Sequence, residues 1–110
     1  MAYDGELADR IRVLLEDEGA VREQRMFGGL AFLVDGNMAV SASGQGGLLL
    51  RVDPARADDL VEEPHVRRAE MRGRIMNGWL RVDAGALATD DDLRTWVLRG
   101  VAYARSLPGK

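Results

Sequence analysis

The sequence predicts a two-layer α+β domain, in which helices pack on an antiparallel sheet of about four to six strands. Three observations lead to this fold class. Apolar residues recur at helical spacing near both ends of the chain, the segments between them are short and strand-like, and glycine-containing turns typical of hairpins join most of these segments. With 110 residues and 46% apolar content, the chain fits one domain, expected to span residues 1–110. The expected order is helix, three or four strands, helix, one or two strands, helix.

The first helix is expected from about Asp4 to Glu18. Asp4 can cap its start, because a carboxylate oxygen accepts hydrogen bonds from the free amides of the first turn. Gly19 is the expected residue after the helix, since glycine readily takes the left-handed conformation there. Acidic residues 16–18 oppose the negative end of the helix dipole, so this end is expected to fray. The apolar stripe comprises Leu7, Ala8, Ile11, Leu14 and Leu15.

Strand-like patterns follow the first helix. The segment Asp35-Gly36-Asn37 predicts a hairpin turn, because Gly36 and Asn37 tolerate positive φ angles. Gly28-Gly29 predicts a tight turn or a bulge. The apolar run from Leu30 to Val34 predicts a central strand that is covered on both faces. The predicted strands of this region are residues 21–27, 30–34, 38–42 and 48–52.

A short second helix is expected to begin at Asp53-Pro54, where the aspartate caps it and the proline suits the first helical position. The polar stretch 65–75 predicts irregular structure that includes a short edge strand near residues 66–71. Residues 77–82 predict a final strand, with Trp79 as its largest candidate for the core.

The last helix has the clearest start and end. Thr89 is the expected N-cap, and the acidic residues 90–92 meet the partial positive charge of the first turn. Gly100 lies on the apolar face, which predicts a close approach between this helix and a strand. Leu107-Pro108 is expected to end the helix, because proline cannot continue it, and Gly109-Lys110 is expected to fray.

The composition excludes several classes of protein. Without cysteine, the chain cannot form a disulfide scaffold, a thiolate nucleophile, a zinc finger or an iron–sulfur site, and one histidine excludes a histidine-rich metal centre. No apolar run approaches the roughly 20 residues of a membrane span, and the N-terminus lacks the pattern of a signal peptide. We therefore expect a cytoplasmic protein with no membrane partner, no cofactor and no metal.

Basic residues are unevenly placed along the chain. Between residues 65 and 82, five arginines stand against one glutamate, a local charge of +4 that leaves −7 for the rest, since the net charge is −3. The candidate contact patch comprises Arg67, Arg68, Arg72, Arg74 and Arg81. These guanidiniums can bind an anion or nucleic acid, or they can pair with nearby carboxylates such as Glu62, Glu63 and Asp83. A sequence pI of about 5.1 and the lack of interleaved aromatics favour pairing.

The most distinctive local string is RMFGG, which comprises Arg25, Met26, Phe27, Gly28 and Gly29. A glycine pair can expose backbone amides to an anion, as phosphate loops do. However, no helix pattern and no Gly-Lys-Ser/Thr sequence follows it. A tight turn between strands, with the methionine and phenylalanine packed nearby, is the interpretation that we favour.

No catalytic residue is assigned. His65 lies in a polar segment typical of a surface histidine, and Ser41 and Ser43 have no neighbouring base in the sequence. The acidic residues 90–92 are explained by the helix dipole rather than by a metal. The sequence therefore favours a protein that is not an enzyme.

Four segments form a distinctive combination: RMFGGLAFLVDGNMAV, GLLLRVD, RGRIMNGWLRVD and the final DDLRTWVLRGVAYARSLPGK. This combination resembles the TfoX N-terminal domain family, also called Sxy-like, from about Asp4 to Pro108. The resemblance implies a two-layer α+β domain with an antiparallel sheet. It carries over residues 25–29 as a signature turn, and Gly78 with Trp79 as the signature of the late strand. The family supplies no agreed catalytic residues.

The resemblance also implies a function. In the proteobacterial namesakes, the full protein regulates natural competence together with the cyclic-AMP receptor protein at a subset of promoters. The namesakes carry a second, C-terminal helical domain, which we do not expect in this chain. We expect a bacterial, non-enzymatic domain for regulation of transcription through protein–protein interaction. Its partner would be a protein, such as a component of the transcription machinery.

Three alternatives to this function remain open. The first is direct binding of nucleic acid or an anion through Arg67–Arg74. The second is a small-molecule site near Gly28-Gly29, including a degenerate enzyme. An open sheet edge also leaves room for a homodimer.

Overall fold

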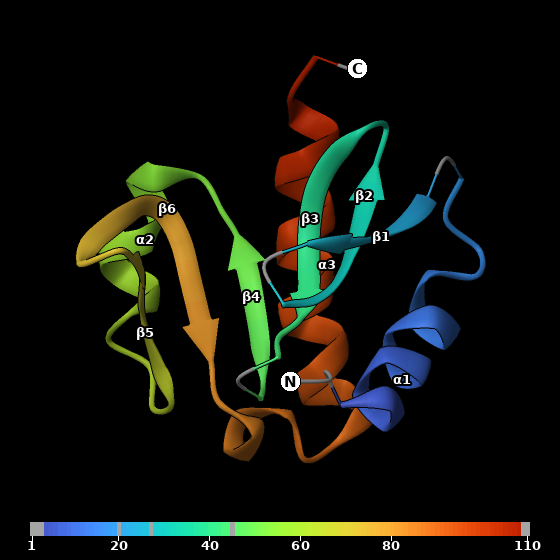
Figure 1. Ribbon diagram of the computed structural model, residues 1–110, viewed down its shortest axis with the longest axis horizontal. Coiled ribbons are helices and arrows are strands. Elements are labelled where there is room, and N and C mark those ends of the chain that lie inside the picture. The colour runs from blue at the N-terminus through green and yellow to red at the C-terminus, as the bar shows by residue number, and fades with distance from the viewer. Residues whose placement is uncertain (1–3, 20, 27, 45, 109–110) are drawn as a thin grey trace.

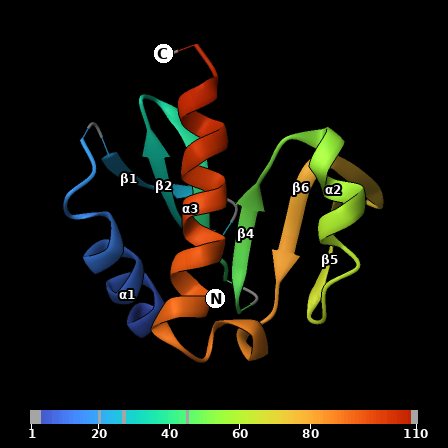
Figure 2. The ribbon, with the colours of Figure 1, turned by 180° about the vertical axis from the view of Figure 1, so that it is seen from behind.

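The structure is a computed structural model that describes residues 4–19, 21–26, 28–44 and 46–108. One antiparallel sheet of six strands has the order β1-β2-β3-β4-β6-β5, and the helices lie on one of its faces (Figures 1 and 2). The strands are β1 (Val21–Met26), β2 (Gly29–Val34), β3 (Asn37–Ala42), β4 (Leu48–Arg51), β5 (Val66–Met71) and β6 (Arg74–Val82). The helices are α1 (Gly5–Leu15), α2 (Pro54–Leu60), the short 3₁₀ helix η1 (Ala84–Leu87) and α3 (Asp90–Ser106). The predicted α+β class and the element order are confirmed.

Polar side chains cap all three α-helices at their starts, as predicted. Asp4 Oδ1 accepts hydrogen bonds from the amides of Glu6 at 3.0 Å and Leu7 at 3.2 Å. Asp53 Oδ1 accepts from the amide of Ala55 at 2.9 Å, and Thr89 Oγ1 accepts from the amide of Asp92 at 3.1 Å. Each cap satisfies backbone amides that have no partner within the helix.

The end of α1 differs from the prediction. The helix ends at Leu15 with Glu16 as its C-cap, rather than at Glu18 with Gly19 following. The acidic residues 16–18 therefore lie at the C-cap and in the turn after it, rather than in the last turn of the helix. Arg105 of α3 binds Glu18 at 2.8 Å, so this turn is tied to another element.

The turn between β2 and β3 has two residues, Asp35 with φ 53° and Gly36 with φ 84°. Two consecutive positive φ angles are typical of the type I′ turns that suit the twist of a hairpin. The prediction that Asn37 is part of the turn is wrong, because Asn37 is the first residue of β3 and is buried. Its side-chain amide donates to the carbonyl of Pro108 at 2.9 Å, which anchors the chain after α3.

The late hairpin is longer than predicted. The expected edge strand 66–71 is confirmed as β5, but β6 begins at Arg74 instead of residue 77. Residues 74 and 75 belong to the stretch that the sequence predicts to be irregular, and they become a strand because they pair with the end of β5. Trp79 is only partly buried, whereas Leu80 and Val82 are the β6 side chains that enter the main core.

Buried apolar residues form two clusters, one on each face of the sheet. The main cluster fills the layer between the sheet and the helices, and it includes Ile11 of α1, Leu60 of α2 and Trp96 of α3. A second cluster lies on the other face. The second cluster comprises Ala31, Leu33, Met38, Leu49 and Ala69, with Met26 and Trp79 packed against it. All six residues of β2 are buried, which confirms a strand covered on both faces.

Candidate functional site

Two arginines stand directly opposite each other on neighbouring strands. Arg67 of β5 pairs in register with Arg81 of β6. Because side chains alternate along a strand and Leu80 and Val82 face the helices, both arginines lie on the face away from the helices. Like charges directly across an antiparallel ladder destabilise the pairing of the strands. The positive charge at this position therefore has a cost in stability.

Arg67, Arg68 and Arg81 each have one side-chain partner among the described residues. Arg67 Nη1 binds Asp83 Oδ1 at 2.6 Å, and Arg81 Nη1 donates to Ser43 Oγ at 2.9 Å. Arg68 forms an ion pair with Asp58 of α2. The pairing with Asp83 was one of the expected ones, but Glu63 binds Arg99 of α3 instead. Exposed ion pairs of this kind are weak, so they leave these guanidiniums able to bind other anions.

A hollow of about 460 Å³ lies among Arg67, Arg68, Glu70 and Arg81. These four residues are called the arginine surface below. Burial lowers the pKa of the Arg81 guanidinium, the neighbouring Arg67 lowers it further, and Asp83 offsets part of this effect. A guanidinium stays protonated at neutral pH even so. The lowered pKa of Arg81 therefore reflects its partial burial first and the repulsion from Arg67 second.

The remaining arginines of the predicted patch lie elsewhere on the hairpin. Arg72, with φ 54°, is in the turn between β5 and β6, and Arg74 is the first residue of β6. Both are exposed at the tip, while the Arg67–Arg81 pair lies near the other end of the ladder. The structure brings together three of the five predicted arginines and separates two.

Charge is divided between the two sides of this end of the sheet. Residues 53–63, which include α2, carry five carboxylates and one arginine. This segment packs on β6 from the helix side (Figure 2). The Arg67–Arg81 pair is on the opposite face, where Asp83 forms an ion pair with Arg67. This division of charge gives the acidic domain a positive surface on the face away from the helices.

The described residues of the signature turn, residues 25, 26, 28 and 29, make mainly backbone and packing contacts. A Cβ on Gly29 would lie 2.2 Å from the carbonyl oxygen of Ala42, so glycine is needed where β2 and β3 approach. Gly28 has φ 76°, Met26 packs against the second cluster, and Arg25 is exposed. Phe27 lies outside the described residues.

Gly78 and Trp79 shape the other side of β6. Gly78 has φ 84°, and a Cβ there would lie 3.0 Å from both the Pro54 side chain and the Val52 carbonyl oxygen. The Gly78 carbonyl accepts from the amide of Val52 at 2.8 Å. The guanidinium of Arg51 lies over the Trp79 ring at 5.4 Å from its centroid. These contacts join the start of α2 to β6.

The described residues contain no group of three or more His, Cys, Asp or Glu residues that could hold a metal ion. His65 is exposed with φ 67°, and its carbonyl accepts from the amide of Asp83 at 2.8 Å. Ser41 and Ser43 are buried in the sheet, and Ser43 Oγ accepts the hydrogen bond from Arg81. Asp90 at the start of α3 binds Arg10 of α1 at 3.3 Å.

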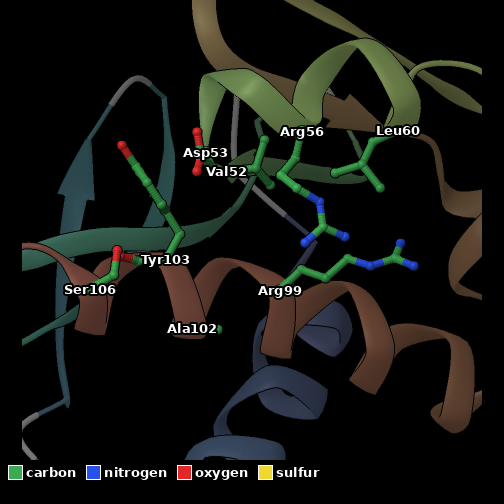
Figure 3. A pocket seen from close by; sticks show the side chains of 8 residues that line it. All are labelled: Val52, Asp53, Arg56, Leu60, Arg99, Ala102, Tyr103 and Ser106. Carbon is green, nitrogen blue, oxygen red and sulfur yellow. The ribbon is translucent and has the colours of Figure 1, made fainter.

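A second hollow was not predicted from the sequence. It measures about 290 Å³ and lies between α2 and α3, with Arg56 and Arg99 among its lining residues (Figure 3). The two arginines belong to distant parts of the chain that the fold brings together. Since neither is part of a motif, no pattern in the sequence could have revealed this pair.

Residues 13–104 match the family model of the TfoX N-terminal domain. The chain belongs to this family. In this TfoX N-terminal domain, the matched segment begins within α1 and ends within α3. It includes the six strands, the arginine surface and every residue that lines the second hollow except Ser106. No curated protein is similar enough to the chain to count as a match. No helix in the described part of the chain is long and apolar enough to cross a membrane.

Proposed function

We propose that this TfoX N-terminal domain is a non-catalytic regulatory module that binds an acidic segment of a protein partner through the arginine surface. The family is the one whose namesakes regulate natural competence, and this kinship supports a role in the control of transcription in the bacterial cytoplasm. The partner would then be a protein of the transcription machinery.

The observation that carries the proposal is the Arg67–Arg81 pair. Two guanidiniums directly across a ladder repel each other, and Asp83 forms an ion pair with Arg67 alone of the two. A carboxylate from a partner would relieve this repulsion and form charge-assisted hydrogen bonds with both forks. If the two arginines bound no anion, their repulsion would lower the stability of the domain without serving a function.

An acidic protein segment fits better than a nucleic acid. The positive surface is small, and the acidic segment 53–63 lies on the other side of the same strands. A duplex presents phosphates over a long distance, so a nucleic-acid site normally extends over a wide basic surface. Direct nucleic-acid binding through the same arginines is the alternative that the experiment separates.

The test uses a fluorescein-labelled oligoglutamate peptide as the probe, titrated with the protein at low salt and followed by fluorescence anisotropy. The R67Q/R81Q double variant should bind the peptide at least about tenfold more weakly than the wild type, because both forks are lost. The matched control is R22Q/R94Q, which removes the same charge from two exposed positions on β1 and α3. This control should keep nearly the affinity of the wild type.

Three results would overturn the proposal: no peptide binding at low salt, an equal loss in both double variants, or tighter and steeply salt-dependent binding of duplex DNA. The last result would favour the nucleic-acid alternative. Circular dichroism of each variant shows whether the fold is intact. The single variant R67Q, which keeps the bond between Arg81 and Ser43, serves if the double variant does not fold.

A further inference from the structure

The cleft between α2 and α3 combines an apolar wall with two cationic groups. Val52 and Leu60 are buried residues that line it, and Ala102 and Tyr103 line it from α3. With a volume of about 290 Å³, the cleft is at the small end of the range for ligand pockets. It lies on the helix side of the sheet and is separate from the arginine surface.

The guanidiniums of Arg56 and Arg99 come from facing helices and extend into the same end of this cleft (Figure 3). The guanidinium of Arg56 has no hydrogen bond or ion pair with any residue in the described part of the chain. Arg99 has one carboxylate contact, a long one of 3.4 Å to Glu63. Two converging cations with so little compensation favour an anion between them.

Arg99 is held in place before any ligand arrives. Its guanidinium carbon lies 4.4 Å from the centroid of the Trp96 ring, and Trp96 is buried in the main core. Stacking on a fixed ring limits the conformations of the side chain, so less entropy is lost when it binds a ligand. Asp53 also lines the cleft, but its carboxylate is engaged in the cap of α2.

We propose that this cleft binds a small organic anion, with a carboxylate or phosphate group on a compact apolar body. The anionic group lies between Arg56 and Arg99, and the apolar body packs against Val52 and Leu60. Bidentate hydrogen bonds from a guanidinium suit both kinds of anion. The domain would thus have a ligand site in addition to its partner surface, and the two can be tested separately.

The experiment is a titration of ¹⁵N-labelled protein with benzoate and with phenyl phosphate, followed by NMR chemical shifts of the backbone amides. Benzamide is the neutral probe of similar shape. We expect saturable shifts in α2 and α3 with at least one of the anions, a Kd on the order of 1 mM as suits so small a ligand, and no saturable shifts with benzamide. The result for the two anions also tells which kind of group the site prefers.

Variants locate the anion. R56Q should weaken binding of the preferred anion at least about fivefold, and R56K should recover part of it because it keeps the charge. R94Q is the control, since Arg94 is an exposed arginine of α3 that does not line the cleft. The proposal is overturned if neither anion gives saturable shifts at concentrations up to about 20 mM, or if benzamide binds as tightly as the anions. It is also overturned if R94Q weakens binding as much as R56Q.

Discussion

At the scale of single residues, Gly100 shows how a poor helix former can be required by packing. A Cβ at this position would lie 2.5 Å from the carbonyl oxygen of Ala39 and 2.7 Å from Leu50 Cδ1. The leucine side chain can move, but the backbone oxygen belongs to β3 and cannot move cheaply. Glycine therefore sets how closely α3 approaches the sheet, as the sequence predicted.

The variant G100A tests this role. Alanine improves helix propensity by about 1 kcal/mol, but the clash with β3 should cost more, because overpacked cores lose about 1–3 kcal/mol. We expect a net decrease of up to about 2 kcal/mol in the free energy of unfolding, measured by urea denaturation with circular dichroism. G5A is the matched control, since a Cβ on Gly5 meets nothing within 4 Å. G5A should be as stable as the wild type or slightly more stable. A G100A variant that is as stable as the wild type, or more stable, would contradict the prediction.

At the scale of elements, α1 is attached to the edge strand β1 by one two-pronged ion pair. Arg12 Nε lies 2.7 Å from Glu23 Oε2, and Arg12 Nη2 lies 2.8 Å from Glu23 Oε1. The hydrogen bonds from Arg12 lower the pKa of the Glu23 carboxyl, and partial burial opposes this shift. The pair joins elements from both layers of the fold.

The pKa of Glu23 implies a pH-dependent contribution to stability. Because the pKa is lower in the folded than in the unfolded protein, the contribution is complete above the unfolded value near 4.5 and is lost as the pH falls through the folded value. We expect E23Q to have a lower urea midpoint than the wild type at pH 7, and we expect this difference to shrink as the pH falls toward about 2.5.

The control for this experiment is E62Q, because the carboxylate of Glu62 has no ion pair with any described residue. E62Q should follow the wild type at both pH values. A difference between E23Q and the wild type that persists at the acidic pH would show that the substitution acts through something other than the ion pair.

Local features of the elements were predictable where they depend on neighbours in sequence. The caps Asp4, Asp53 and Thr89 need only the residues of one helical turn, and all three were predicted. The start of β6 was not, because residues 74 and 75 extend the strand by pairing with the end of β5. The role of Asn37 was also missed, since its partner Pro108 lies at the other end of the chain.

At the scale of the whole molecule, the candidate sites depend on tertiary contacts. The sequence identified a charged segment, but only the register of β5 on β6 reveals that Arg67 faces Arg81. The sequence also could not show that Arg72 and Arg74 lie at the hairpin tip, away from the Arg67–Arg81 pair. The cleft of Arg56 and Arg99 requires α2 and α3 to be placed side by side on the sheet. Composition predicts how much charge there is, whereas topology decides where it acts.

The two core clusters raise the question of whether the domain unfolds as one unit. They lie on opposite faces of the same strands: Phe32 belongs to the main cluster, and its neighbours Ala31 and Leu33 belong to the second. Neither cluster can open widely without breaking ladders that the other needs. The two tryptophans report on one cluster each, because Trp96 is in the main cluster and Trp79 packs on the second.

This arrangement predicts cooperative unfolding that single-tryptophan variants can test. W79F leaves only Trp96 as a fluorescent tryptophan, and W96F leaves only Trp79. In each variant, the urea midpoint from fluorescence should coincide with that from far-UV circular dichroism, because two-state unfolding gives the same transition with every probe. W96F should have the lower midpoint of the two, since Trp96 is 5% exposed and its truncation leaves a cavity in the main core. A Trp79 signal that changes at lower urea than the circular dichroism would mean that the second face opens on its own, in contradiction to a single cooperative unit.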